Sequence, residues 1–186
     1  MKNIILIGYR CTGKTSVGKK LSERLDLPFI DTDGLIMLDA GMSVDEIVRE
    51  GGWTLFRQKE REVIGGLSSV EDVIIAPGGG ALEDPENREV LRGNGLFVWL
   101  TADSKTVVER MRSDRKSGGQ RPPLSRGDPG TEAAVMIRKR EPVYRELADL
   151  AIDTSNKSID AVADEIFDFV HKEQTCQETP SERSSG

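Results

Sequence analysis

The chain has 186 residues, of which 37% are hydrophobic and 31% are charged, as in a single soluble globular domain. No apolar run approaches the ~20 residues of a membrane-spanning helix, and the apolar opening is too short for a signal peptide. Because 32 acidic residues outnumber 26 basic ones, the net charge is −6 and the surface as a whole repels nucleic acid. We therefore expect a cytoplasmic protein with neither a nucleic-acid nor a membrane partner.

Cysteine and histidine are too rare for several kinds of site. The two cysteines, Cys11 and Cys176, give neither a disulfide framework nor a zinc-binding spacing, and we expect both to be thiols in a reducing compartment. His171 is the single histidine and lies near the end of a helical pattern. A catalytic triad with a buried histidine and a metal cage of several histidines are therefore excluded.

Five short apolar runs rich in β-branched residues alternate with helix-period patterns along the chain. Such alternation predicts an α/β fold in which a parallel sheet is connected by crossover helices. The runs cover residues 4–7, 29–30, 73–76, 96–100 and 150–152.

Three segments depart from simple alternation within one predicted domain, residues 1–172. Residues 33–69 are too long for a crossover, and glycines at 41 and 51–52 divide them into about three short helices, which we interpret as a substrate-binding insertion. Ser43 and Glu46 form a capping box that starts the middle helix. Residues 112–127 carry clustered arginines beside Gly-Gly and Pro-Pro pairs, which predicts a mobile loop that meets an anion. Residues 173–186 are predicted to be a disordered polar tail.

The segment after the first apolar run is a phosphate-binding loop. Its letters GYRCTGKT, residues 8–15, fit the pattern Gly-x-x-x-x-Gly-Lys-Ser/Thr, between a strand and a helix as the pattern requires. Backbone N–H groups and the helix N-terminus would surround phosphate oxygens, Lys14 would reach the outer phosphates, and the Thr15 hydroxyl would complete a magnesium shell. The nucleotide-binding residues predicted in this region are Gly8, Arg10, Cys11, Thr12, Gly13, Lys14, Thr15 and Ser16.

Three enzyme classes use such a loop. The guanine-reading pattern Asn-Lys-x-Asp of GTPases is incomplete here, because Ile159 stands where the carboxylate is needed. Large motor ATPases need a longer chain and a strand ending in a carboxylate pair, which residues 73–77 do not supply. A compact small-molecule kinase fits best.

Two further segments predict the acceptor site. The second strand ends in Asp31-Thr32-Asp33, next to the phosphate-binding loop at the carboxyl edge of the sheet. Two carboxylates two positions apart on extended backbone point the same way, so one could hold magnesium through a water while the other accepts a hydrogen bond, and finally a proton, from an acceptor hydroxyl. An alternative role for Asp33 is the N-cap of the next helix. The glycines at 78–80 let a ligand approach bare backbone.

Together these segments resemble the shikimate kinase family over about residues 3–171. The resemblance rests on the phosphate-binding loop, the Asp-Thr-Asp segment, Phe56-Arg57, the triple glycine, Arg121-Pro122 and the pattern from Arg140 to Tyr144. It implies a three-layer α/β P-loop fold with a five-stranded parallel sheet, a helical substrate-binding insertion and a mobile lid. It also implies transfer of the ATP γ-phosphoryl group to the 3-hydroxyl of shikimate, in the pathway to chorismate and the aromatic amino acids, by a monomer that uses Mg²⁺.

The same resemblance assigns roles to single residues. Lys14, Asp33 and Arg121 would be catalytic, and Thr15 with Asp31 would hold the metal. Arg57 and Arg140 would clamp the shikimate carboxylate, because planar guanidinium groups suit a carboxylate bidentately. The remaining implied contacts are Asp33, Gly78, Gly79 and Gly80 with shikimate, and Arg115 and Arg121 of the lid with ATP, with the region of Asn156 near adenine.

Two departures from the family pattern leave alternatives open. Cys11 stands where a glycine is usual, which restricts the loop if that position needs a positive φ. Pro123 follows Arg121-Pro122 where leucine is commoner. The departure at Cys11 keeps a nucleotide-binding regulatory module without catalysis as a rival. A gluconate-type kinase is a second rival, because sugar acids also present hydroxyls and a carboxylate.

Overall fold

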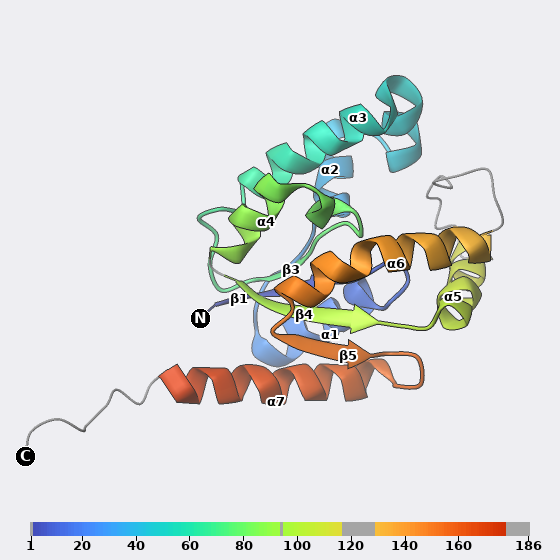
Figure 1. The fold of residues 1–186 in the computed structure, drawn as a ribbon. Coiled ribbons are helices and arrows are strands. Elements are labelled where there is room, and N and C mark those ends of the chain that lie inside the picture. The colour runs from blue at the N-terminus through green and yellow to red at the C-terminus, as the bar shows by residue number, and fades with distance from the viewer. Residues whose placement is uncertain (1, 94, 117–128, 178–186) are drawn as a thin grey trace, which may run out of the picture.

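The structure is a computed structural model that describes residues 2–93, 95–116 and 129–177 (Figure 1). Its strands form one sheet in the order β2-β3-β1-β4-β5, and every neighbouring pair is parallel. All five fall where the apolar runs predicted them, so the predicted α/β fold with a five-stranded parallel sheet is confirmed. The strands are β1 (Asn3–Ile7), β2 (Phe29–Asp31), β3 (Ile74–Ala76), β4 (Gly95–Thr101) and β5 (Leu150–Asp153).

Helices cover both faces of the sheet (Figure 1). They are α1 (Lys14–Leu25), α2 (Thr32–Ala40), α3 (Val44–Gly65), α4 (Pro85–Arg92), α5 (Ser104–Lys116), α6 (Pro129–Leu147) and α7 (Ile159–Gln177), with the short 3₁₀ helix η1 (Ala81–Glu83). Within the described part of the chain, no helix combines the length and the apolar character that crossing a membrane requires.

Strand β1 shows how the sheet divides the core into two halves. Its side chains alternate, as they must in a strand: Ile4 and Leu6 pack against α1 and α7, whereas Ile5 and Ile7 pack against the other face. That second face is covered by the end of α3 and by α4 and α6. Because the strand is buried on both sides, it is an uninterrupted apolar run.

Helices α2 and α3 occupy the predicted insertion and enclose a small apolar cluster of their own, which contains Ile36, Ile47 and Phe56. Ser43 and Glu46 form the predicted capping box at the start of α3. Gly52, with φ 69° and ψ −175°, is a kink that splits α3 into two helical pieces. The three short helices expected from the glycines are therefore confirmed.

Two predicted boundaries are wrong. Helix α5 continues to Lys116, so the start of the segment predicted as a loop at 112–127 is helical. Helix α7 continues to Gln177, into the predicted disordered tail at 173–186. Arg112, Arg115 and Lys116 in the first segment, and Glu173, Gln174 and Gln177 in the second, are residue types that extend an existing helix at little cost. The rest of both segments, residues 117–128 and 178–186, lies outside the described residues.

Candidate active site

The phosphate-binding loop between β1 and α1 adopts a backbone that few residues tolerate. Gly8 has φ 142° and Gly13 has φ 104°, and a Cβ at Gly8 would collide with the carbonyl oxygen of Leu100. Cys11 has φ 61°, in the left-handed region, which glycine adopts easily and most other residues do not. The position therefore does need a positive φ, which is the condition under which Cys11 restricts the loop.

Lys14 folds back over the loop from the first residue of α1. Its ammonium group donates hydrogen bonds to the carbonyl oxygens of Gly8 at 2.9 Å and Tyr9 at 3.1 Å. The charge is thus held beside two carbonyl groups of the loop, where an anion bound by the loop would meet it.

A pocket of about 460 Å³ opens beside this loop. Every predicted nucleotide-binding residue from Arg10 to Ser16 lines it. Gly8, the first residue of the loop, does not line the pocket, but its carbonyl oxygen accepts a hydrogen bond from Lys14. The far wall comes from α5 and from the turn between β5 and α7, where Lys157 and Ser158 lie. The region of Asn156 that the family resemblance places near adenine therefore borders this pocket.

Asp31 is the cap of α2 and faces the same pocket. Its Oδ1 accepts hydrogen bonds from the backbone N–H groups of Asp33 and Gly34, and its Oδ2 accepts one of 2.9 Å from the Thr15 hydroxyl. The alternative in which Asp33 caps the helix is therefore wrong. The prediction that Asp31 and Asp33 both lie on extended backbone is wrong too. Helix α2 begins at Thr32 without a linker, and Asp33 reaches the pocket from the first turn of this helix.

The pair of Thr15 and Asp31 has the chemistry of a magnesium site. A hydroxyl and a carboxylate oxygen lie side by side at the pocket, and Mg²⁺ binds through one or two such oxygens together with substrate phosphates and water. Among the described residues, no group of three or more histidine, cysteine, aspartate or glutamate side chains could hold a metal by itself. The residues therefore fit a metal that arrives with a phosphate ligand.

A second, smaller pocket of about 60 Å³ adjoins the first and is lined by the predicted acceptor residues. Arg10 and Asp33 line both pockets. The remaining walls come from the insertion, from the triple glycine after β3 and from α6, and include Val44, Trp53, Phe56, Arg57, Glu60, Gly78, Gly79, Gly80 and Arg140.

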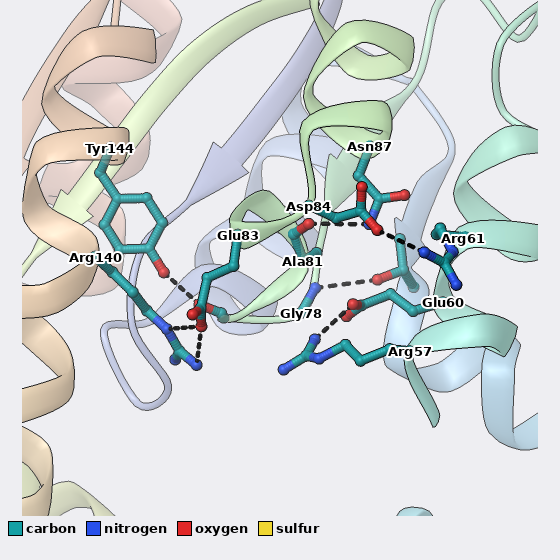
Figure 2. A network of polar contacts seen from close by, with 12 residues as sticks. Arg57, Glu60, Arg61, Gly78, Ala81, Glu83, Asp84, Asn87, Arg140 and Tyr144 are labelled. Carbon is teal, nitrogen blue, oxygen red and sulfur yellow. Dashed lines mark hydrogen bonds and ion pairs between the residues drawn. The ribbon is translucent and has the colours of Figure 1, made fainter. Parts of the chain in front are cut away.

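Charged side chains crowd against the backbone of the triple glycine, so a side chain at Gly78 or Gly80 would displace them. A Cβ at Gly78 would lie 2.6 Å from Asp33 Oδ1 and 2.9 Å from Glu60 Oε1. A Cβ at Gly80 would collide with the Arg57 guanidinium and lie 2.8 Å from Arg140 Nη2. Both guanidinium groups thus reach the same point from opposite sides (Figure 2).

Arg57 lies against a buried carboxylate. Its Nη1 donates a 2.5 Å hydrogen bond to Oε2 of Glu60, a side chain with no exposed surface. Burial raises the pKa of Glu60 to about 7, although the Arg57 charge and hydrogen bond act in the opposite direction. The guanidinium also lies 5.5 Å from the centre of the Phe56 ring and 5.9 Å from that of Trp53.

Arg140 reaches the pocket from α6 and is almost fully buried, with 6% of its side chain exposed. Its Nε and Nη2 donate to one oxygen of Glu83 at 2.8 and 2.7 Å. One turn further along α6, the Tyr144 hydroxyl donates to the carbonyl oxygen of Gly79, which ties the glycine turn to the same helix (Figure 2). Sequence reasoning missed Glu83, because no motif marks it.

Arg10 bridges the two pockets. Its Nη2 donates a 3.0 Å hydrogen bond to Glu132 of α6, and its guanidinium lies 5.7 Å from the centre of the Tyr9 ring. Arg140 lies at the same distance from that ring. The Tyr9 ring therefore lies between Arg10, which lines both pockets, and Arg140, which lines the smaller one.

Arg110 of α5 is a further residue that sequence reasoning missed. It donates to the carbonyl oxygens of Cys11 at 3.3 Å and Thr154 at 2.7 Å, and it lines the nucleotide pocket. Thr154 is buried, and its hydroxyl donates to the carbonyl oxygen of Thr12. These bonds brace the phosphate-binding loop from outside. The two predicted lid residues are not placed: Arg121 and the side chain of Arg115 lie outside the described part of the molecule.

Comparisons with known proteins agree with this geometry. The family model described as shikimate kinase matches residues 10–171. A shikimate kinase of Syntrophus aciditrophicus is 45% identical, with 89% of each chain covered, and one of Geobacter sulfurreducens is 40% identical, with 93% of each covered.

Solved structures show the same likeness. A shikimate kinase from Acinetobacter baumannii in complex with shikimate superposes with a TM-score of 0.86 at 31% identity and covers 93% of this chain and 94% of its own. A gluconokinase from Sinorhizobium meliloti, at 18% identity and a TM-score of 0.60, shares the fold. The chain therefore belongs to the shikimate kinase family of phosphotransferases, as the sequence motifs indicated.

Proposed function

We propose that this protein transfers the γ-phosphoryl group of ATP to the 3-hydroxyl of shikimate, in the pathway to chorismate and the aromatic amino acids. The observation that carries the proposal is the junction of the two pockets. Asp33 and Arg10 line both, so a hydroxyl in the smaller pocket would meet a phosphoryl group in the larger one beside a carboxylate and a cation.

The acceptor would be held by the charges of Arg57 and Arg140 and by the close approach of the glycine turn. Arg57 and Arg140 converge at the glycine turn and would clamp the shikimate carboxylate, since two planar guanidinium groups offer parallel N–H donors. The three glycines let the backbone of this turn lie close to both guanidinium groups and to a ligand that they hold. Clamping the carboxylate at this end turns the ring hydroxyls toward Asp33, which orients one of them for attack.

The transfer then needs little covalent work from the protein. The acceptor oxygen forms a bond to the γ-phosphorus, the bond to the β,γ-bridging oxygen breaks, and Asp33 accepts the hydroxyl proton. Lys14 would neutralise charge on the outer phosphates from its place at the loop carbonyls, and Arg121 would do so from the lid. Thr15 and Asp31 would hold Mg²⁺, which supplies further neutralisation of the phosphate oxygens when it is bound.

A coupled assay of ADP formation with shikimate, with gluconate and with no acceptor tests the proposal. Release of ADP that depends on shikimate and yields shikimate 3-phosphate is the expected result. Preference for gluconate would assign the acceptor pocket to another hydroxy acid. Binding of both ligands without ADP release would mean a regulatory module, in which the backbone at Cys11 is the first feature to examine. We also propose a cytoplasmic location, from the composition, and a monomer, from the family resemblance.

A further inference from the structure

Glu83 joins the glycine turn of the acceptor pocket to two cations of α6. It is the last residue of η1, which follows the triple glycine directly. Its Oε1 accepts hydrogen bonds from Nε and Nη2 of Arg140, at 2.8 and 2.7 Å (Figure 2). Its Oε2 accepts one of 2.5 Å from Lys139. Neither Glu83 nor Lys139 lines the pocket itself.

The bonds to one oxygen fix the plane of the Arg140 guanidinium. Since Nε and Nη2 lie on one edge of that group, a carboxylate oxygen bound to both prevents rotation about the last side-chain torsion. The donors left over are those of Nη1 and the second N–H of Nη2, and both nitrogens lie at the glycine turn, with Nη1 3.7 Å from the place of a Cβ at Gly79 and Nη2 2.8 Å from that at Gly80. The donors left for a ligand therefore face the pocket.

The burial of Arg140 makes this support necessary. Only 6% of its side chain is exposed, and the like charge of Arg57 reaches the same point beside Gly80. Without a counter-charge, two guanidinium groups this close would repel each other, and the buried one would turn toward solvent. Glu83 supplies that counter-charge from outside the ligand volume.

Lys139 helps to keep Glu83 ionised, and the ionised carboxylate is the form that offsets the charge of Arg140. Partial burial by itself would raise the pKa of Glu83, but the hydrogen bond from Lys139 and the charge of Arg140 outweigh it, and the pKa lies below its usual value. The carboxylate is therefore ionised throughout the neutral range.

From these contacts we propose that Glu83 is the positioning residue that orients Arg140 toward the carboxylate of the acceptor, and so sets the affinity for the acid. The inference rests on the proposed place of Arg140 in the carboxylate clamp. Glu83 acts through Arg140 and does not touch the acceptor, so its loss weakens acceptor binding and leaves nucleotide binding intact.

Steady-state kinetics of Glu83→Ala and Glu83→Gln test this with two acceptors, shikimate and its methyl ester. The KM for shikimate rises about 10-fold in Glu83→Ala, because Arg140 loses the charge-assisted pair that orients it. It rises less in Glu83→Gln, because the amide oxygen still accepts one hydrogen bond. The KM for ATP stays within about twofold. The preference of the enzyme for the acid over the uncharged ester shrinks by the same factor as the KM rises.

Glu141→Gln is the matched control, because Glu141 forms an exposed ion pair of 2.6 Å with Arg145 on the same helix and is expected to leave every constant unchanged. Arg140→Met separates two ways of failing. If Arg140→Met leaves the KM for shikimate unchanged, the clamp itself is wrong and the inference falls with it. If Arg140→Met raises that KM but neither Glu83 variant does, only the role of Glu83 is wrong. A parallel rise for acid, ester and ATP would also overturn it, as the sign of a general loss of structure.

Discussion

The guanidinium of Arg110 donates a 2.7 Å hydrogen bond to the carbonyl oxygen of Thr154, and a second one, of 3.0 Å, to the hydroxyl of the same residue. Thr154 in turn donates to the carbonyl oxygen of Thr12 in the phosphate-binding loop. One side chain of α5 thus connects the turn after β5 with the loop after β1, and both border the nucleotide pocket.

Replacement of Arg110 by methionine should therefore weaken nucleotide binding. The variant keeps the apolar stem but loses the bonds to Cys11 and Thr154, so the loop is no longer held in the conformation that directs its N–H groups inward. We expect the Kd for ATP to rise roughly 10-fold, as for the loss of a charged hydrogen bond of 1.5 kcal/mol or more, with the Kd for shikimate nearly unchanged. Calorimetric titration with each ligand measures both.

Lys105→Met is the control for that variant, because Lys105 lies on the same helix with an exposed side chain, outside the nucleotide pocket and outside the predicted lid. It should bind ATP as the parent does. Equal losses of ATP affinity in the two variants would show that net charge on α5, and not the bracing of the loop, is responsible.

Arg57→Ala should act on the other pocket. The substitution removes one half of the proposed clamp, so the KM for shikimate should rise about 10- to 100-fold while the KM for ATP changes little. Arg57→Lys should recover only part of the loss, because an ammonium group lacks the planar fork. Initial rates at varied concentrations of each substrate give the comparison.

Arg61→Ala controls for the removal of an arginine from α3. Arg61 lies one turn further along, pairs with Asp84 at 3.3 Å and does not line the acceptor pocket. Its KM values should match those of the parent. An Arg57→Ala enzyme that lost ATP and shikimate affinity to the same degree would contradict the assignment of this residue.

The sequence could predict what depends on local pattern. The apolar runs located the five strands, and the spacing of Gly8, Gly13 and Lys14 located the phosphate-binding loop, because a strand, a loop of fixed length and a helix are enough to form it. The glycines at 41 and 52 likewise predicted the breaks in the insertion, since both adopt a positive φ there.

Contacts between distant segments could not be predicted in this way. Arg110 meets Thr154 across 44 positions, and Arg140 meets Glu83 across 57, with no spacing that marks either pair. Asp31, and not Asp33, caps α2 because the chain enters this helix directly after β2. The sequence alone did not show where the strand ends and the helix begins. Such details are decided by packing.

The backbone at Cys11 predicts an ordering of stabilities. With φ 61° this residue occupies the left-handed region, which disfavours any side chain by roughly 1–2 kcal/mol and suits glycine. Glycine loses about 0.5–1 kcal/mol through its freedom in the unfolded chain, so Cys11→Gly should be more stable than Cys11→Ala by about 0.5–1 kcal/mol. Urea unfolding of both variants measures the difference.

The alanine variant is the appropriate reference, because both substitutions remove the sulfur that packs against the cluster of Tyr9, Val107 and Met111. Their difference therefore isolates the backbone. An alanine variant as stable as the glycine variant would show that the loop relaxes to another conformation when the sulfur is absent.

Glu60 should make the stability of the protein fall as the pH rises through neutrality. Burial raises its pKa from 4.5 to about 7, so between these values the folded protein holds a proton that the unfolded chain has released. The state that binds more protons is favoured at low pH, so this contribution to the free energy of unfolding is fully present below about pH 4.5 and is lost by about pH 7 to 8. At about 1.4 kcal/mol per pKa unit, the loss amounts to a few kcal/mol.

Glu60→Gln keeps the shape of the side chain and cannot ionise, so its free energy of unfolding should lack this decline. Other groups titrate in both proteins, and the difference between parent and variant from pH 5 to pH 8 therefore isolates Glu60. Glu62→Gln, an exposed change on the same helix, should follow the parent at every pH. Parallel curves for the parent and Glu60→Gln would mean that the Arg57 charge holds Glu60 ionised throughout, and that burial does not dominate at this carboxyl.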